Sequence, residues 1–209
     1  MSFDYFVVFA EMRTGSNFLE ENINKFSDLK CYGEVFNPHF IAYPNTAELF
    51  GYTHAQRDEN PAPVLEGIKR KGDALGGFRF FYDHDARVFE DIIKDRNCAK
   101  IILTRNPIDS FVSWKIAERT GQWKLTNATH HKAEKVNVDI AEFEGHLAHL
   151  QEFQVKILNG LQRNGQTAFF VAYEDLQDVD VMNGMARYLG ASDRLDGLSK
   201  KLKKQNPSP

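Results

Sequence analysis

Short apolar runs alternate along this chain with longer stretches in which apolar residues recur every three or four positions. The runs lie at 5–10, 29–33, 74–81, 100–104 and 167–173 and are rich in β-branched and aromatic residues. Such runs predict β-strands. We expect the strand at 5–10 to be buried on both faces and the strand at 167–173 to be buried as well. Helical patterns begin at Ser16, near Asp85 and at Pro107, and one over 179–189 ends at Gly190. The alternation predicts an α/β fold with a central parallel sheet flanked by helices.

Two further helical patterns carry apolar stripes. Asp139–Leu161 predicts a long amphipathic helix, whose stripe packs on the core and comprises Phe143, Leu147, Leu150, Phe153, Ile157 and Leu161. A last helix is predicted with Leu195, Leu198 and Leu202 on one face and lysines toward its C-terminal end.

Residues 36–72 break the alternation. This stretch contains Pro38, Pro44, Pro61 and Pro63 among Tyr, His and Asn residues. Proline and small polar residues at this density predict a largely irregular excursion with one short helix. We expect the excursion to form the acceptor side of a site.

A small, hydroxyl-rich and cationic turn separates the first strand from the first helix. It has the sequence Arg13-Thr14-Gly15-Ser16-Asn17. Glycine lets the backbone approach a ligand, the hydroxyl and amide groups add donors, and a helix start offers free N–H groups with a partial positive charge. The turn therefore predicts an anion site, most naturally for phosphate. A purely structural alternative has Ser16 as a helix cap and Arg13 solvated.

A second turn repeats this arrangement after the strand at 100–104. Arg105 ends the strand, Pro107 suits the first turn of a helix, and Ser113 lies about two turns further on. We expect both turns at the same edge of one sheet, with Arg105 as a fork-shaped phosphate donor and Ser113 near the same group. Alternatively, Arg105 pairs with Asp109 at the surface and Ser113 only packs its helix.

Composition narrows the function classes. At 209 residues the chain fits one domain, large enough to bury ~70% of its unfolded surface. Its net charge of −3 gives no broad cationic field of the kind that binding a nucleic-acid polymer requires. Two cysteines are too few for a disulfide framework or a metal cluster. No charged leader precedes Asp4, and no apolar run approaches the ~20 residues of a membrane span, so we expect a cytoplasmic protein without a transmembrane segment.

At its two turns the chain resembles the sulfotransferases that use 3'-phosphoadenosine 5'-phosphosulfate (PAPS). Residues 13–17 are similar to that family's loop for the 5'-phosphosulfate, and Arg105 followed eight residues later by Ser113 is similar to its 3'-phosphate signature. Residues 171–176, Val-Ala-Tyr-Glu-Asp-Leu, resemble its strand end near the adenine, which implies a contact from Tyr173. Arginine at position 13 resembles the bacterial carbohydrate branch, which includes trehalose, nodulation-factor and lipopolysaccharide sulfotransferases. The Arg-Lys-Gly loop of the cytosolic enzymes has no counterpart near the C-terminus, so part of the 3'-phosphate contact is unassigned.

The resemblance implies a single sulfotransferase domain over 1–209 with a P-loop nucleotide-kinase-like fold. It implies PAPS as the sulfuryl donor, no metal, and a hydroxyl acceptor on a small molecule, carbohydrate or glycolipid. It further implies that the donor is bound by residues of the three matched segments, namely Arg13, Thr14, Gly15, Ser16, Asn17, Arg105, Ser113 and Tyr173.

Sulfuryl transfer to a hydroxyl needs a base and a cation at the leaving oxygen. Glu34 follows the second predicted strand and is flanked by apolar residues, which raise the pKa of a carboxyl group when they exclude water. Its segment resembles the glutamate-bearing stretch of the bacterial branch, where that glutamate is the general base. The alternative bases are His39, His54 and His84. The purely structural alternative has Glu34 as a surface residue of a turn.

Arg13 would neutralise the leaving group. Arg79 would reach the sulfate or an acidic acceptor, or extend from a sheet edge into solvent.

Other nucleotide enzymes fit less well. A P-loop kinase needs Gly-x-x-x-x-Gly-Lys-[Ser/Thr], and the stretch before Ser16 lacks its first glycine and its lysine. A cysteine phosphatase would need a cysteine where Val7 stands. The alternative from another class is a catalytically idle module that binds a 3'-phosphoadenosine nucleotide.

Overall fold

A five-stranded parallel sheet forms the centre of the protein. The computed structural model describes residues 3–69, 72–123 and 135–199. The strand order is β2-β5-β1-β6-β7, and all neighbouring pairs are parallel. The strands are β1 (Tyr5–Phe9), β2 (Leu29–Cys31), β5 (Leu75–Phe80), β6 (Cys98–Thr104) and β7 (Phe169–Ala172). The α/β fold predicted from the alternating pattern is confirmed.

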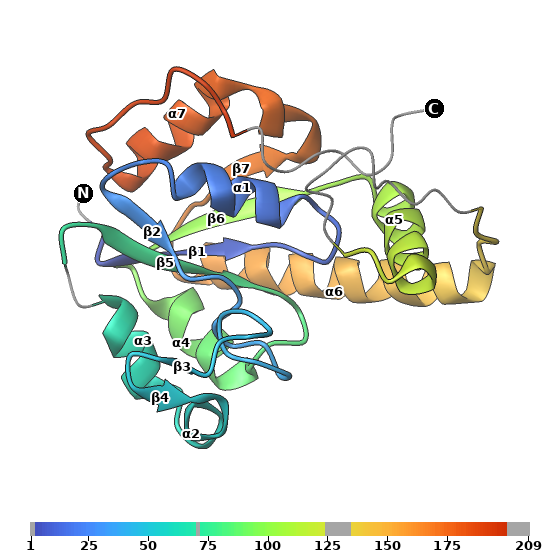
Figure 1. Ribbon diagram of the computed structural model, residues 1–209, viewed down its shortest axis with the longest axis horizontal. Coiled ribbons are helices and arrows are strands. Elements are labelled where there is room, and N and C mark those ends of the chain that lie inside the picture. Colours follow the sequence, from blue (N-terminus) through green and yellow to red (C-terminus); the bar gives the residue numbers. More distant parts are fainter. Residues whose placement is uncertain (1–2, 70–71, 124–134, 200–209) are drawn as a thin grey trace.

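Helices cover both faces of this sheet (Figure 1). The α1 and α7 helices pack on one face, and α3, α4 and α6 pack on the other. The described helices are α1 (Ser16–Ile23), α2 (His54–Glu59), α3 (Ala62–Lys69), α4 (Ala86–Lys94), α5 (Pro107–Thr120), α6 (Ile140–Arg163) and α7 (Val179–Leu189), and a short 3₁₀ helix, η2 (Tyr173–Gln177), follows β7.

The β1 strand shows why the sequence folds in three layers. Phe6 and Val8 point into the cluster formed with α1 and α7, while Val7 and Phe9 point into the cluster formed with α3, α4 and α6. Each of these side chains is at most 1% exposed. A continuous apolar run is needed here because successive side chains of a strand enter opposite layers.

The excursion at 36–72 contains more regular structure than its composition predicted. A hairpin of β3 (Glu48–Leu49) and β4 (Tyr52–Thr53) leads into α2, and α3 follows directly. Thr53 and Gln56 form a reciprocal capping box at the start of α2. Pro61 precedes α3 and Pro63 lies in its first turn, a position that suits proline. Two of the four prolines that we read as loop signals, Pro61 and Pro63, therefore mark a helix start.

Two further predictions are wrong in part. The strand at 167–173 is an edge strand rather than a buried one, and Phe170 is 59% exposed. Residues 191–199, in which the last helix was predicted to begin, are not helical. The remainder of that prediction, with Leu202 and the lysines, lies outside the described residues.

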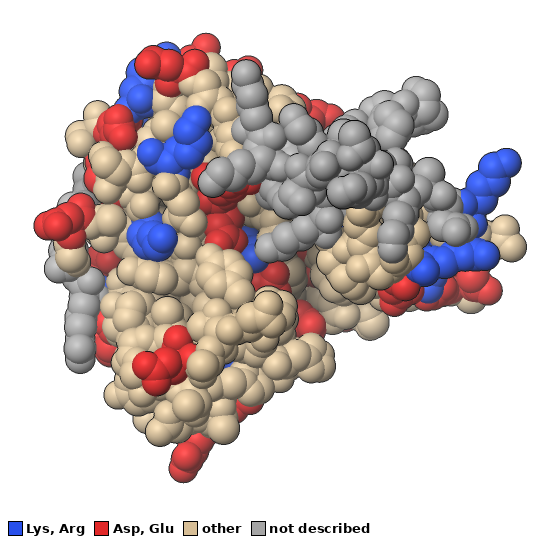
Figure 2. All heavy atoms as spheres, viewed as in Figure 1, with Lys and Arg blue, Asp and Glu red and all other residues tan. Residues whose placement is uncertain are grey.

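Basic and acidic side chains are scattered among uncharged ones on the face shown in Figure 2. None of the described helices is long and apolar enough to cross a membrane.

Candidate active site

The two cationic turns meet at the carboxyl edge of the sheet. They follow β1 and β6, which are adjacent parallel strands. After β1 the chain enters α1 on one face, and after β6 it enters α5, which packs against α6 of the opposite layer. A crevice outside the strand ends, where the connections diverge, is the usual ligand site of open α/β sheets.

The first turn leaves several backbone donors free. Arg13 and Gly15 both have positive φ, 65° and 88°. Within the described residues, the N–H groups of Gly15, Ser16 and Asn17 donate no hydrogen bond. Thr14 braces the turn instead, because its hydroxyl donates to the Glu11 carbonyl at 2.6 Å. The start of α1 therefore offers an anion three N–H groups and the positive end of a helix dipole.

Gly15 is required by space as well as by φ. A Cβ atom at this position would lie 2.6 Å from Cδ1 of Leu176 and 2.9 Å from Cδ2 of Tyr173. The η2 segment therefore lies directly against the turn, and residues 13–17 and 171–176, matched separately in the sequence, are in contact.

The structure joins the two turns through a phosphate cluster, formed by Arg13, Arg105, Ser113 and Tyr173. Nε of Arg13 donates to Oγ of Ser113 at 3.0 Å, and Nη1 of Arg105 donates to the Arg13 carbonyl at 2.7 Å. The Arg105 guanidinium lies over the Tyr173 ring, 3.9 Å from its centroid. Nη1 of Arg13 also donates to the Trp123 carbonyl at 2.6 Å.

The phosphate cluster has an unbalanced positive charge. Within the described ranges, neither Arg13 nor Arg105 pairs with a carboxylate, and Nε of Arg105 is buried without a partner. Burial, and then repulsion from Arg105, lower the pKa of Arg13. Two neighbouring guanidinium groups without a counterion are the arrangement expected of a site for a multiply charged anion. The alternative in which Arg105 pairs with Asp109 does not occur in the structure, because the guanidinium instead faces Tyr173 and the first turn.

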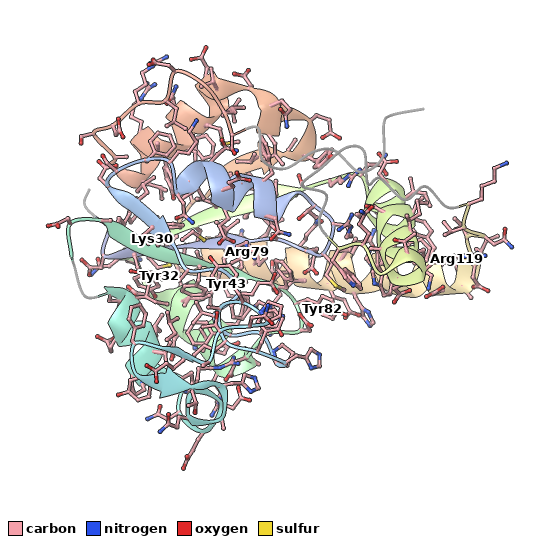
Figure 3. All side chains as sticks on the ribbon, in the orientation of Figure 1. Lys30, Tyr32, Tyr43, Arg79, Tyr82 and Arg119 are labelled. Atoms are coloured by element: carbon pink, nitrogen blue, oxygen red, sulfur yellow. The ribbon has the colours of Figure 1, made fainter. Side chains whose placement is uncertain are left out.

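A second group, the Glu34 cluster, lies beside the start of α1 and comprises Glu34, Arg79, Glu20 and Asn37. Arg79 of β5 pairs with Glu20 at 2.6 Å and with Glu34 at 3.1 Å. Its Nη1 also donates to Oγ of Ser16 at 3.1 Å. Arg79 lies at the centre of the molecule next to Tyr43, which donates to Glu20 (Figure 3). Ser16 thus connects the Glu34 cluster to the phosphate turn.

Backbone contacts fix the position of Glu34. The Arg79 N–H donates to the Gly33 carbonyl at 2.8 Å, and the Glu34 N–H donates to the Ala42 carbonyl at 2.9 Å. Gly33 has a φ of 77°, and a Cβ atom there would lie 2.5 Å from the Ala42 carbonyl oxygen. Glycine is therefore needed for the chain to turn from β2 toward Arg79.

The surroundings of Glu34 and Arg79 differ from two expectations. The apolar neighbours of Glu34 do not enclose its carboxyl group; they enter the core, and Asn37 Nδ2 donates to the carboxylate at 2.8 Å. Arg79 does not extend from a sheet edge, since β5 lies inside the sheet and the residue is 2% exposed. Pairing with Glu34 and Glu20 compensates the charge of the buried Arg79.

Of the three histidines considered as alternative bases, His84 lies next to Glu34, whereas His39 and His54 contact other residues. His84 lies with Nε2 3.9 Å from Oε2 of Glu34, and its side chain is buried. His54 pairs with Asp58 at 3.4 Å on α2, and the backbone N–H of His39 donates to Oδ1 of Asn37 at 2.9 Å. Within the described residues, His, Cys, Asp and Glu side chains form no group of three or more that could hold a metal ion.

Sequence reasoning missed Glu20 and Arg57. Glu20 lies one helical turn after Ser16, a spacing that puts both on one face of α1 and could have identified it. Arg57 had no such signal, because it lies in the stretch read as irregular. It is fully buried, and its Nη2 donates to the Asn37 carbonyl at 2.6 Å and to the Phe40 carbonyl at 3.0 Å. Arg57 therefore holds the turn that orients Asn37 and Glu34.

Comparison with known proteins adds two similarities. Nodulation protein H of Rhizobium tropici is 22% identical over 177 residues, which are 82% of this chain and 68% of that protein. A crystal structure of a sulfotransferase from Alicyclobacillus acidocaldarius matches with a TM-score of 0.55 at 17% identity, covering 97% of this chain and 86% of that one. No protein-family model matches the chain.

The comparisons support a bacterial sulfotransferase family. This agrees with the resemblance drawn from the two turns, and the structural match confirms the predicted fold, a parallel sheet flanked by helices as in that sulfotransferase. Similarity to sulfotransferases supports transferase activity broadly.

Proposed function

We propose that this chain transfers a sulfuryl group from PAPS to a hydroxyl group of a carbohydrate or glycolipid. The proposal rests chiefly on one observation. Arg13 and Arg105 meet, without a carboxylate partner among the described residues, at a helix start with three free N–H groups. Such a site suits a ligand with two separate phosphate-type groups.

The donor would be divided between the two turns. Arg105 and Ser113 would hold the 3'-phosphate, and Arg13 with Gly15, Ser16 and Asn17 would hold the 5'-phosphosulfate. Thr14 would contribute indirectly by stabilising the turn, since its hydroxyl donates a hydrogen bond to the Glu11 carbonyl. Tyr173, which covers Gly15 and Arg105, would contact the adenine.

Transfer would proceed in line, without a covalent enzyme intermediate. Glu34 would take the acceptor hydroxyl proton while that oxygen bonds to sulfur and the bond from sulfur to the bridging phosphate oxygen breaks. The products are a sulfate ester and adenosine 3',5'-bisphosphate, and Glu34 later returns its proton to solvent. Arg13 would stabilise the charge on the departing oxygen, and Arg79, between Ser16 and Glu34, would hold the sulfuryl group.

We also propose that the reaction takes place in a reducing compartment, the cytoplasm. Cys31 and Cys98 are both buried and unpaired. Unpaired thiols are typical of proteins that do not pass through an oxidising compartment.

Two measurements test the function. Calorimetric titration with adenosine 3',5'-bisphosphate tests the donor site, and transfer of labelled sulfate from PAPS into cell extracts, followed by identification of the labelled product, tests the reaction. Binding together with a labelled glycan or glycolipid supports the proposal. Binding without transfer to any acceptor would favour an idle nucleotide-binding module, and absence of binding would overturn the donor assignment.

A further inference from the structure

A hollow lies between the end of β5 and the middle of α6, outside the phosphate cluster. We call it the β5–α6 hollow. Its wall is formed by the β5–α4 turn, α4 and α6, with the residues Phe80, Tyr82, His84, Ala86, Phe89, His149, Glu152, Phe153 and Lys156. No role in donor binding falls to these residues.

The β5–α6 hollow has an aromatic wall that is open to solvent. Tyr82 stacks on His149 with 5.6 Å between ring centroids and 20° between planes, and Tyr82 is 43% exposed (Figure 3). Phe80, Phe89 and Phe153 beneath are buried. An exposed flat ring above a buried aromatic floor suits a ligand that has one apolar face.

Charged side chains complete the rim of the hollow. Glu152 and Lys156 are exposed on α6, and Nζ of Lys156 lies 4.5 Å from the centroid of the Phe89 ring. A carboxylate and an ammonium group side by side can accept from and donate to neighbouring hydroxyl groups. This combination favours a polyhydroxylated ring over a phenol, for which a closed apolar slot would be the better fit.

His84 connects the hollow to Glu34. It lines the hollow, and its Nε2 lies 3.9 Å from Oε2 of Glu34. Its side chain is buried, and both ring nitrogens lack a hydrogen-bond partner among the described residues. Buried polar atoms are normally satisfied, so two unpartnered nitrogens on one ring leave hydrogen-bonding capacity that the described residues do not use. A hydroxyl oxygen can both donate to and accept from such a ring.

Tyr82 also links the hollow to the phosphate turn. Its N–H donates to the buried carboxyl group of Glu11 at 3.1 Å, and Glu11 lies two residues before Arg13. The β5–α4 turn is thereby held beside the β1–α1 turn, as expected if the two present an acceptor and a donor to each other.

From this geometry we infer that the β5–α6 hollow is the acceptor site and that it takes a sugar ring. None of its lining residues lies in 36–72, so this inference places the acceptor outside the excursion that we expected to form the acceptor side. The ring stacks on Tyr82 and His149, its hydroxyls meet Glu152 and Lys156, and the hydroxyl to be sulfated is held by His84 beside Glu34. This inference rests on the proposed function, because only a transferase requires an acceptor next to Glu34.

Saturation-transfer NMR tests the inference without any turnover. The probes are methyl glycosides of glucose, galactose, mannose and N-acetylglucosamine, with 4-nitrophenol as the aromatic competitor. At least one glycoside is expected to receive saturation on its ring protons. Tyr82→Ala should reduce that signal at least fivefold, and Lys156→Met should reduce it as well. Phe170→Ala, which removes an exposed aromatic ring from the distant edge strand, should leave it unchanged.

Each other outcome counts against the inference. Failure of all four glycosides to bind, full signal in Tyr82→Ala, or displacement of the glycosides by 4-nitrophenol at equal concentration would overturn it. A protein that binds glycosides through Tyr82 but transfers no sulfate would overturn the proposed function instead. A protein that transfers sulfate to a glycan with the same KM in Tyr82→Ala would leave the function intact and remove the acceptor from this hollow.

Discussion

Oγ of Ser113 accepts a hydrogen bond of 3.0 Å from Nε of Arg13, although 100 residues separate them in the chain. Arg13 lies in the first turn and Ser113 lies on α5, which follows the second turn, so the bond holds the first turn against α5. It also keeps the Arg13 guanidinium beside Arg105 despite their like charge, which is unfavourable unless an anion binds. The bond between Arg13 and Ser113 therefore preorganises the site for an anionic ligand.

Arg105→Ala should abolish most of the preference for adenosine 3',5'-bisphosphate over AMP. A charge-assisted hydrogen bond contributes ~1.5–3 kcal/mol, so the ratio of the two affinities should fall by about 10- to 100-fold. Calorimetry with both nucleotides measures the ratio. Arg194→Ala is the control, since it removes an exposed guanidinium that pairs with Asp180. Equal ratios in parent and Arg105→Ala would remove Arg105 from the 3'-phosphate site.

Gly15→Ala should cost more stability than Gly190→Ala and should also weaken bisphosphate binding. Both glycines have a φ of 88°, but a Cβ atom at Gly190 has nothing within 4 Å, whereas at Gly15 it would meet Leu176 and Tyr173. The left-handed backbone costs both variants roughly 1–2 kcal/mol. Only Gly15→Ala must in addition displace Tyr173 from Arg105. Urea unfolding and bisphosphate titration of both variants test this. Equal stability and equal bisphosphate affinity in the two variants would show that η2 moves away from the turn at no cost.

Glu34→Gln should lower turnover by ~10²–10⁴ while bisphosphate affinity stays close to normal, because a positioned base acts on the acceptor and not on the nucleotide. The chain offers a matched control in Glu20→Gln. Glu20 pairs with the same arginine, Arg79, so a loss caused only by disturbing Arg79 would appear in both variants. Equal turnover in Glu34→Gln and Glu20→Gln would argue that Glu34 is not the base.

The sheet and both turns could be predicted because each depends on local sequence. A strand buried on both faces must be apolar throughout, and Tyr5–Phe9 is; a phosphate turn needs glycine and small polar residues, and 13–17 has them. The resemblance also predicted that three segments far apart in the sequence share one site, and the structure brings Arg13, Arg105 and Tyr173 from these segments together.

The contents of the 36–72 segment could not be predicted in the same way. Arg57 is buried there because the carbonyls of Asn37 and Phe40 accept its guanidinium protons, and that partnership depends on a turn formed by residues far from α2. Likewise, Arg79 could be placed on a strand, but its pairing with both Glu20 and Glu34 required the register of β5 beside β1 and β2. Tertiary contacts of this kind leave no periodic pattern in the sequence.

Unfolding free energy should fall as the pH is lowered through the range in which unfolded histidine takes up a proton, and His84 should cause part of the fall. Burial, and then the charges of Arg79 and Arg57, lower the pKa of His84 to about 3. Native His84 therefore stays neutral, while the unfolded residue protonates near a pKa of about 6.5. Its depressed pKa gives stability that is present above about pH 6.5 and is lost as the pH falls toward 3, at up to ~1.4 kcal/mol per pH unit.

His84→Asn isolates this contribution, because asparagine is similar in size and does not titrate. Glu34 and Asp83 face His84 at 3.9 and 4.0 Å, and burial raises the pKa of Asp83, which works in the opposite direction as the pH falls. Since both carboxylates are present in parent and variant, their contributions largely cancel in the difference between the two. Urea unfolding at pH 7, 6, 5 and 4 should show the parent losing stability faster than His84→Asn. Below pH 6 the extra slope of unfolding free energy against pH should correspond to the uptake of about one proton on unfolding. Parallel curves would mean that His84 is protonated in the native protein, and a charged ring between Glu34 and Asp83 could then donate to an acceptor hydroxyl but not accept from it.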